Sequence, residues 1–215
     1  SYKVKDYLKA AAMYYPRWDK AYAEQLVERF GLDRKKKICK LSKGMMSMVT
    51  IVLALASKAP ITILDEPVAG LDVVAREDFY RLLLEEYTAT GRTFVISTHI
   101  IEEAAGVLEQ VILMDQGNIL EVAPTEEFVA SFSFVSGRDA DVDAVVQRVG
   151  KEKLLHTETF GRQKGAALRA SVADSRAAAG ALGLDVDVSA VNLQKAFVYL
   201  VGEKEGEGHV QKPAV

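Results

Sequence analysis

The sequence lacks several features that would assign the chain to particular classes of protein. A single cysteine, Cys39, excludes an intrachain disulfide framework and fits a reducing compartment. There is no basic surplus, because 27 Lys and Arg stand against 30 Asp and Glu, and this formal net charge of −3 argues against a dedicated nucleic-acid binder. No secretory signal opens the sequence. The most apolar stretch, Met48–Ala56, is far shorter than the ~20 residues that span a bilayer.

What is present is an ordinary globular composition. The 215 residues are 49% hydrophobic and 27% charged, which argues against a disordered or fibrous chain. At about 100–200 residues per domain, this length allows one large domain, or one domain with a smaller appendage.

Three helices are predicted before any strand. Apolar residues recur at helical spacing from Val4 until Pro16 stops the pattern. Asp19 can cap a second helix that ends at Gly31. A third helix is expected over about 45–57. We therefore predict a helical subdomain over residues 1–59.

The pattern changes after Pro60 to short apolar strands that alternate with helices. The strands are expected at 61–64, 93–97 and 111–114, and the helices lie between them. This alternation predicts an α/β fold with a largely parallel sheet, whose first strand is buried on both faces. We assign residues 60–130 to this core.

The composition shifts again from Ser131 toward Ala, Val and Asp. Strands around 132–135 and 166–172 and helices around 142–149, 175–182 and 193–200 predict a small α+β appendage over residues 131–202. Residues 203–215 are rich in Gly, Lys and Glu, and we expect a disordered tail there.

Two carboxylates, Asp65 and Glu66, follow the first strand directly. Open α/β sheets bind ligands at the carboxyl ends of their strands. One carboxylate there can hold Mg²⁺ through water, and the second can orient or deprotonate an attacking water. The alternative is that Asp-Glu-Pro only closes a strand and turns the chain.

Other polar residues lie at helix starts or strand ends. Ser42 and Gly44 precede an apolar helix whose first amides suit a phosphate, although a simple N-cap is the alternative. His99 follows the second strand, where it could reach a γ-phosphate or lie at the surface. Asp72 could cap the helix that begins near Val73, and a simple cap is the alternative to any binding role for it.

Taken together in this order, these elements resemble the ATP-binding subunit of an ABC transporter. Leu41–Met45 resembles the signature motif (LSGGQ in its common form), with Lys43 in place of the first Gly and Met45 in place of the Gln. The form Leu-Ser-Lys-Gly-Met resembles bacterial subfamilies that export antibiotics, peptides or lipid-linked compounds. Three further elements complete the resemblance, which covers roughly residues 7–128: the Walker B strand Ile61–Glu66, the D-loop Gly70–Asp72 and the switch histidine His99.

The resemblance implies an ATPase that works as a dimer and drives a membrane partner. It implies that Asp65 holds Mg²⁺, that Glu66 is the base for the hydrolytic water, and that His99 stabilises the γ-phosphate. It also implies a transmembrane permease subunit, a second ATP-binding subunit, no nucleic acid, and a peripheral location on the cytoplasmic face of the membrane. The ATP-binding residues that it implies are Ser42, Lys43, Gly44, Met45, Asp65 and Asp72. Of these, Ser42 and Gly44 reach the ATP held by the second subunit, Lys43 either lies near its phosphates or points into solvent, and Asp72 joins the two sites.

Two elements of the family are missing from the sequence. No G-x-x-x-x-G-K-[ST] sequence occurs in the 215 residues, and the glutamine loop is absent as well. We therefore expect an incomplete subunit that lacks Walker A and is inactive alone, and the start at Ser1 without Met fits this expectation. The alternatives are a non-catalytic degenerate or regulatory subunit and a soluble chromosome-maintenance ATPase half, although residues 1–40 show no sustained heptads. The transported substrate cannot be read from the sequence.

Overall fold

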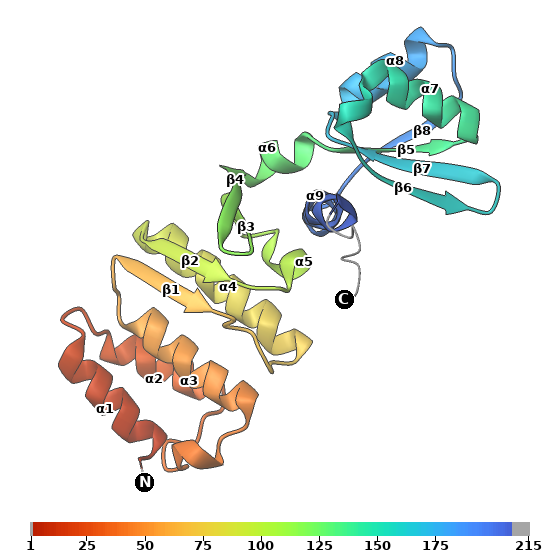
Figure 1. Ribbon diagram of the computed structural model, residues 1–215. Helices are drawn as coiled ribbons and strands as arrows, with labels where there is room; N and C mark the ends of the chain where they lie inside the picture. The colour runs from red at the N-terminus through yellow and green to blue at the C-terminus, as the bar shows by residue number, and fades with distance from the viewer. Residues whose placement is uncertain (1, 208–215) are drawn as a thin grey trace, which may run out of the picture. The chain divides into compact units, whose positions relative to one another are not determined.

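The computed structural model describes residues 2–207, which form two compact units that divide between Val107 and Leu108 (Figure 1). In this described part of the chain, no helix is both long and apolar enough to cross a membrane. The domain boundaries expected at 59/60 and 130/131 stay predictions.

The first unit begins with the predicted group of helices (Figure 1). Asp19 caps the second of them by accepting a hydrogen bond of 2.9 Å from the Tyr22 amide, as its residue type suggested. Leu26, Val27 and Val52 are buried where the helices pack. The elements are α1 (Val4–Tyr14), α2 (Lys20–Arg29), the short 3₁₀ helix η1 (Ile38–Lys40) and α3 (Lys43–Ala56).

A strand–helix–strand unit follows these helices. Strands β1 (Ile61–Asp65) and β2 (Thr93–Ser97) are parallel, and helix α4 (Val73–Thr90) connects them. Their register pairs Asp65 with Ser97, so the two strands end side by side. A short helix, α5 (Ile101–Ala104), comes after β2. The carboxyl ends of β1 and β2 therefore meet at one edge of the sheet, where Asp65 and Glu66 were expected from the sequence.

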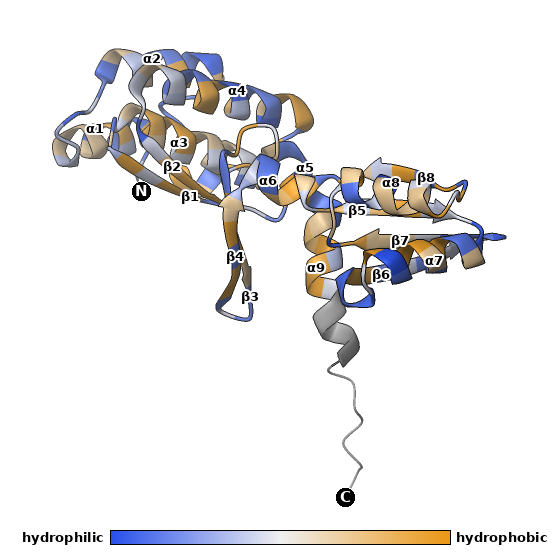
Figure 2. Ribbon diagram, turned by 90° about the horizontal axis from the view of Figure 1, so that it is seen from above, coloured by the Kyte–Doolittle hydropathy of each residue, from blue (hydrophilic) through white to orange (hydrophobic). Residues whose placement is uncertain are grey.

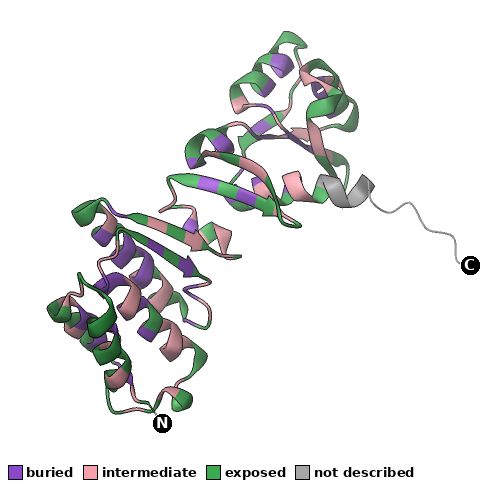
Figure 3. Ribbon diagram, turned by 60° about the vertical axis from the view of Figure 1, so that its left-hand side comes forward, coloured by how far each residue is buried: buried purple, intermediate pink, exposed green. Residues whose placement is uncertain are grey.

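The prediction that β1 is buried on both faces is wrong. Buried and exposed residues alternate along the strand (Figure 3), and Ile61 and Ile63 are 64% and 74% exposed. Thr62 and Leu64 point to the other face and are buried. A short apolar run does not distinguish burial on one face from burial on two, because Ile and Thr suit both environments.

The second unit opens with a hairpin of β3 (Gln110–Asp115) and β4 (Asn118–Pro124). Gln116 and Gly117 both have positive φ at the turn, as tight two-residue hairpins require. The third predicted strand therefore pairs with its sequence neighbour in an antiparallel sheet of its own, which corrects the expected largely parallel sheet. Figure 2 shows hydrophobic colour along this hairpin.

The rest of the second unit confirms an α+β appendage and adds its topology. A four-stranded antiparallel sheet has the order β6-β7-β5-β8, and two helices connect its strands. This is the β-α-β-β-α-β arrangement called ferredoxin-like. After α6 (Thr125–Ala130) the elements are β5 (Ser133–Gly137), α7 (Asp139–Val149), the 3₁₀ helix η2 (Lys151–Lys153), β6 (Leu154–Phe160), β7 (Gln163–Leu168), α8 (Val172–Ala181) and β8 (Asp187–Ala190).

Two different surfaces of this sheet are covered. One face packs against α7 and α8 around a cluster of buried residues that includes Val135, Val145 and Leu168. On α9 (Leu193–Glu207), the Tyr199 ring stacks on His156 and Phe134. The predicted tail boundary at 203 falls inside α9, which reaches Glu207, and residues 208–215 lie outside the described part.

Candidate functional site

Asp65 and Glu66 lie at the carboxyl end of β1, and Ser97 of the neighbouring strand contacts both of them. The Ser97 hydroxyl donates a hydrogen bond of 2.7 Å to Asp65 Oδ1. The Ser97 carbonyl accepts a bond of 2.9 Å from the Glu66 amide. The sequence places Ser97 beside His99 but gives it no role, although its position at the end of the second strand is a signal that could have identified one.

Glu66 has an unusual backbone conformation and a defined side-chain partner. Its φ is 45°, a region that few residues other than glycine adopt and that is enriched at functional sites. Its Oε1 accepts a hydrogen bond of 3.0 Å from the His99 amide and lies 2.8 Å from His99 Nδ1. The His99 side chain is 76% exposed, so a ligand can approach it directly. The structure thus brings these two sequence-predicted residues together.

The oxygen donors at this edge fit a magnesium ion. Asp65 is exposed, and its Oδ1 is held by Ser97. Mg²⁺ prefers hard oxygen ligands and usually takes one or two carboxylates, with water and substrate phosphates completing its shell. In the described residues, no group of three or more His, Cys, Asp or Glu could hold a metal by itself. Asp65 could therefore hold Mg²⁺ only as part of such a mixed shell.

The signature-like segment forms the start of α3. Ser42 is the N-cap, and its hydroxyl accepts a hydrogen bond of 3.2 Å from the Met45 amide. Ser42 and Lys43 are exposed, whereas Gly44 and Met45 are half-buried. The Lys36 ammonium lies 3.4 Å from the Met45 sulfur. The prediction that Ser42 is an N-cap is confirmed. The binding of ATP by these residues stays a prediction.

This segment packs on the loop that follows β1. A Cβ added at Gly44 would collide with the carbonyl oxygen of Gly70, whose φ is +79°. The Ser47 hydroxyl donates a hydrogen bond of 2.8 Å to the Ala69 carbonyl. Asp72 ends the loop and caps α4, since its Oδ1 accepts a bond of 2.9 Å from the Ala75 amide. The signature-like and D-loop-like residues are thus neighbours in the structure.

An ion pair links α4, which follows this loop, to α5, which follows His99. Arg76 Nη1 of α4 lies 2.8 Å from Glu103 Oε1 of α5. One turn further along α4, burial and then the charge of Glu103 raise the pKa of Tyr80 above its usual value. Sequence reasoning missed this pair, because nothing in the spacing joins residue 76 to residue 103.

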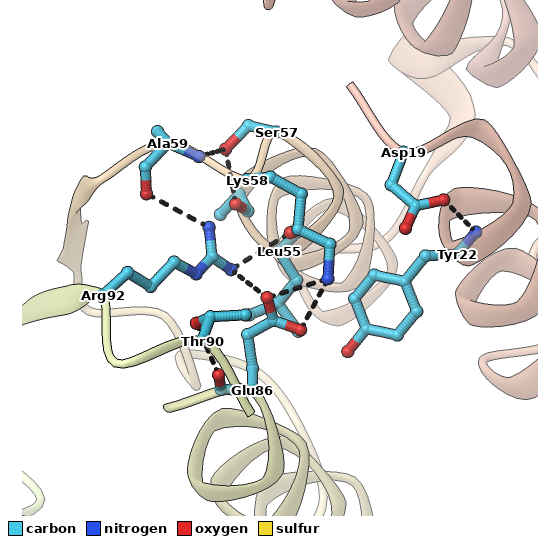
Figure 4. A network of polar contacts seen from close by, with 10 residues as sticks. Asp19, Tyr22, Leu55, Ser57, Lys58, Ala59, Glu86, Thr90 and Arg92 are labelled. Carbon is cyan, nitrogen blue, oxygen red and sulfur yellow. Dashed lines mark hydrogen bonds and ion pairs between the residues drawn. The ribbon is translucent and has the colours of Figure 1, made fainter. Parts of the chain in front are cut away.

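The far end of α3 is fixed by a buried network of charges (Figure 4). Both oxygens of Glu86 lie 2.8 Å from the Lys58 ammonium, and Arg92 Nη2 is 3.3 Å from Oε1. Arg92 also donates a bond of 3.0 Å to the Leu55 carbonyl at the end of α3. Burial, with a smaller effect of Glu86, raises the pKa of Tyr22 to about 12. The network therefore joins α3 to α4 and β2.

A surface depression of about 800 Å³ lies between α2 and the start of α4. Asp72 lines it, but none of Asp65, Glu66 and His99 does. Arg29 and Asp78 form a two-point ion pair in its wall, with bonds of 2.7 and 2.6 Å. The depression is separate from the carboxylates at the end of β1.

Comparison with known proteins finds one family model in the first half of the chain and relatives that match 52–62% of its length. A family model described as "AAA domain, putative AbiEii toxin, Type IV TA system" matches residues 3–105. The chain is 25% identical over 134 residues to the ABC transporter ATP-binding protein YtrB of Bacillus subtilis (strain 168), covering 62% of this chain and 46% of that protein. It is 36% identical over 118 residues to the taurine import ATP-binding protein TauB of Escherichia coli O6:K15:H31 (strain 536 / UPEC), covering 52% and 46%.

A solved structure described as "Structure of ATP binding subunit of ABC transporter" superposes with a TM-score of 0.52 at 24% identity, covering 60% of this chain and 55% of that one. This likeness shows the fold of the matched 60% of the chain, which is that of part of the P-loop NTPase core of ABC ATPases. The relatives are ATP-binding proteins of ABC transporters. The chain spans about half the length of the curated relatives it matches.

Proposed function

We propose that the chain is the part of an ABC transporter ATP-binding subunit that carries the Walker B strand, the signature segment, the D-loop and the switch histidine. The observation that carries this proposal is the contact between Glu66 and His99 beside Asp65. A carboxylate held next to an exposed histidine, at the carboxyl ends of parallel strands, is suited to promote hydrolysis of the terminal phosphoanhydride bond of ATP.

The proposed roles are those that the resemblance implies, and the positions of the side chains support them. Asp65 is exposed with one oxygen free of the Ser97 bond, so it can hold Mg²⁺ through water. Glu66 acts as the base that accepts a proton from the attacking water, and His99 stabilises the γ-phosphate. Bound ATP and Mg²⁺ supply the phosphoryl group and the charge neutralisation for this hydrolysis.

The signature segment serves a second site. Ser42, Lys43, Gly44 and Met45 stand at the start of α3, where the free amides and the positive end of the helix dipole favour a phosphate. We propose that they contact ATP held by a second ATP-binding subunit. Asp72, on the loop against this segment, joins the two sites.

The proposed assembly includes a transmembrane permease subunit and places the ATPase on the cytoplasmic face of the membrane, with no nucleic acid. Export rests on the resemblance of Leu-Ser-Lys-Gly-Met to exporter subfamilies. The name of TauB describes import, so this relative gives export no support.

The test is ATP turnover by the protein expressed from its complete reading frame, with and without the substitution Glu66→Gln. We expect turnover in the unmodified protein and its loss in the variant, together with an ATP-stabilised dimer in gel filtration, because the amide cannot accept the proton. Glu77→Gln removes an exposed carboxylate of α4 and is the matched control. Unchanged turnover in Glu66→Gln contradicts the role of Glu66. A stop codon upstream, with no turnover at all, favours a degenerate subunit.

A further inference from the structure

Ser97 is the one residue described at the site that contacts both carboxylate residues through hydrogen bonds. Its hydroxyl donates to Asp65 Oδ1 at 2.7 Å, and its carbonyl accepts from the Glu66 amide at 2.9 Å. The parallel register places Asp65 and Ser97 directly beside each other at the ends of β1 and β2. The two contacts are separable, since a side-chain substitution removes the first and leaves the second in place.

The hydroxyl contributes little to folding. Asp65 and Ser97 are both exposed, and a hydrogen bond between exposed groups exchanges with water at small net gain. Serine is also a poorer strand residue than threonine or valine, whose branched side chains suit a pleated sheet. A reason for this hydroxyl must therefore be sought in what it does to the carboxylate.

Its effect on Asp65 is to fix the orientation of the carboxylate. With Oδ1 engaged by a short charge-assisted bond, the plane of the carboxylate is set and Oδ2 remains for other contacts. A side chain at an exposed strand end otherwise samples several rotamers, and ordering it when a ligand binds costs free energy. Hydrogen bonds to metal ligands typically change metal affinity or activity about 10- to 100-fold.

We propose that Ser97 is a positioning residue that orients Asp65 toward the metal ion of the bound nucleotide. This inference rests on the proposed function, because it assigns Asp65 to the metal. It goes beyond that function by naming a residue of β2 that sets the geometry of the carboxylate on β1.

The test compares two variants of nearly equal shape. Ser97→Thr keeps the hydroxyl, whereas Ser97→Val replaces it with a methyl group, and both suit a strand. Thr93→Val, at the opposite end of β2, is the matched control. The readout is the affinity of the protein for Mn²⁺, a paramagnetic substitute for Mg²⁺. The protein is expressed from the complete reading frame and saturated with a non-hydrolysable ATP analogue, and electron paramagnetic resonance measures the bound Mn²⁺.

We expect Ser97→Val to weaken Mn²⁺ binding about tenfold, while Ser97→Thr and Thr93→Val stay close to the unmodified protein. None of the three variants should melt at a lower temperature than the unmodified protein, because Thr and Val suit a strand at least as well as Ser. A purely structural role of Ser97 would instead lower the melting temperature of Ser97→Val. Equal Mn²⁺ affinities in Ser97→Thr and Ser97→Val overturn the proposal.

A second measurement does not depend on nucleotide. Crystal structures of the 215-residue chain and of its Ser97→Val variant should show one Asp65 orientation in the first and several in the second. The same single orientation in both overturns the role of Ser97. No Mn²⁺–nucleotide binding by the unmodified protein contradicts the proposed function instead, so the two failures are distinguishable.

Discussion

Gly44, in the first turn of α3, lies against the carbonyl oxygen of Gly70, with no room for a Cβ between the two backbones. The Ser47–Ala69 hydrogen bond lies beside this contact and holds the same two segments together. The close approach explains why a glycine at position 44 matters even where its own φ is ordinary. It fixes the distance between the start of α3 and the loop that leads to Asp72.

Replacing Gly44 by alanine should therefore push the two segments apart. We expect Gly44→Ala to lower the free energy of unfolding by about 1–3 kcal/mol, the usual cost of overpacking, and to abolish the ATP-stabilised dimer. Urea unfolding of the chain measures the first effect. Gly106→Ala is the control, because a Cβ there meets nothing within 4 Å. Equal stability of the two variants would contradict this close packing.

The 215-residue chain alone should bind ATP weakly. It contains no G-x-x-x-x-G-K-[ST] sequence, and each charge-assisted bond to a phosphate is worth about 1.5–3 kcal/mol. Losing three such bonds costs about a thousandfold in affinity or more. Isothermal calorimetry should therefore detect no saturable binding at micromolar ATP, and coupled assays should detect no hydrolysis. Saturable micromolar binding would refute this prediction.

The Glu86 network should be sensitive to loss of its negative charge. Glu86 and Arg92 side chains are each 5% exposed, and removing one partner of a buried ion pair typically costs about 3–5 kcal/mol. We expect Glu86→Gln to lower the free energy of unfolding by about 3 kcal/mol, as measured by urea denaturation. The neighbouring exposed residue provides the control Glu85→Gln, which should change stability little. A stability loss of equal size in both variants would argue against a special role for the network.

Asp78 should make stability depend on pH in the acid range. The Arg29 guanidinium holds the pKa of the Asp78 carboxyl below its usual value. A lowered pKa in the folded state means that the stabilisation is fully present above the unfolded value of about 4 and is lost as pH falls through the folded value. Asp78→Asn should therefore destabilise the chain at pH 6 and differ less from it below pH 4. Thermal melts across this range test the effect, with Glu77→Gln as the control.

The local structure of the site was largely predictable, because it depends on short-range chemistry. Ser42 and Asp72 are residues whose side chains accept hydrogen bonds from helix amides, and both cap the helices expected after them. Asp65 and His99 follow strands that are parallel neighbours, so their common edge could be predicted from strand order alone. Their roles toward ATP stay predictions.

The features that the sequence could not show depend on contacts between distant residues. The Ser97–Asp65 bond requires the strand register, and the Arg76–Glu103 pair requires the packing of two helices. The one-sided burial of β1 depends on which elements cover the sheet, and the apolar pattern of the strand does not show which faces are covered. In the appendage, Val172 begins α8 instead of ending a strand, because Ser171 caps the helix there.

The loop from Glu66 to Asp72 has a consequence for how the two groups of site residues affect each other. Its backbone is closed by hydrogen bonds from Ala69 to Glu66 and from Leu71 to Val68, both 3.1 Å long. Each of these hydrogen bonds closes a tight turn, so the backbone from Glu66 to Leu71 has fewer free torsion angles than an open loop of the same length. The contact of Gly70 with Gly44 and the residue Glu66 therefore belong to one ordered segment, which ties the start of α3 to the carboxyl end of β1.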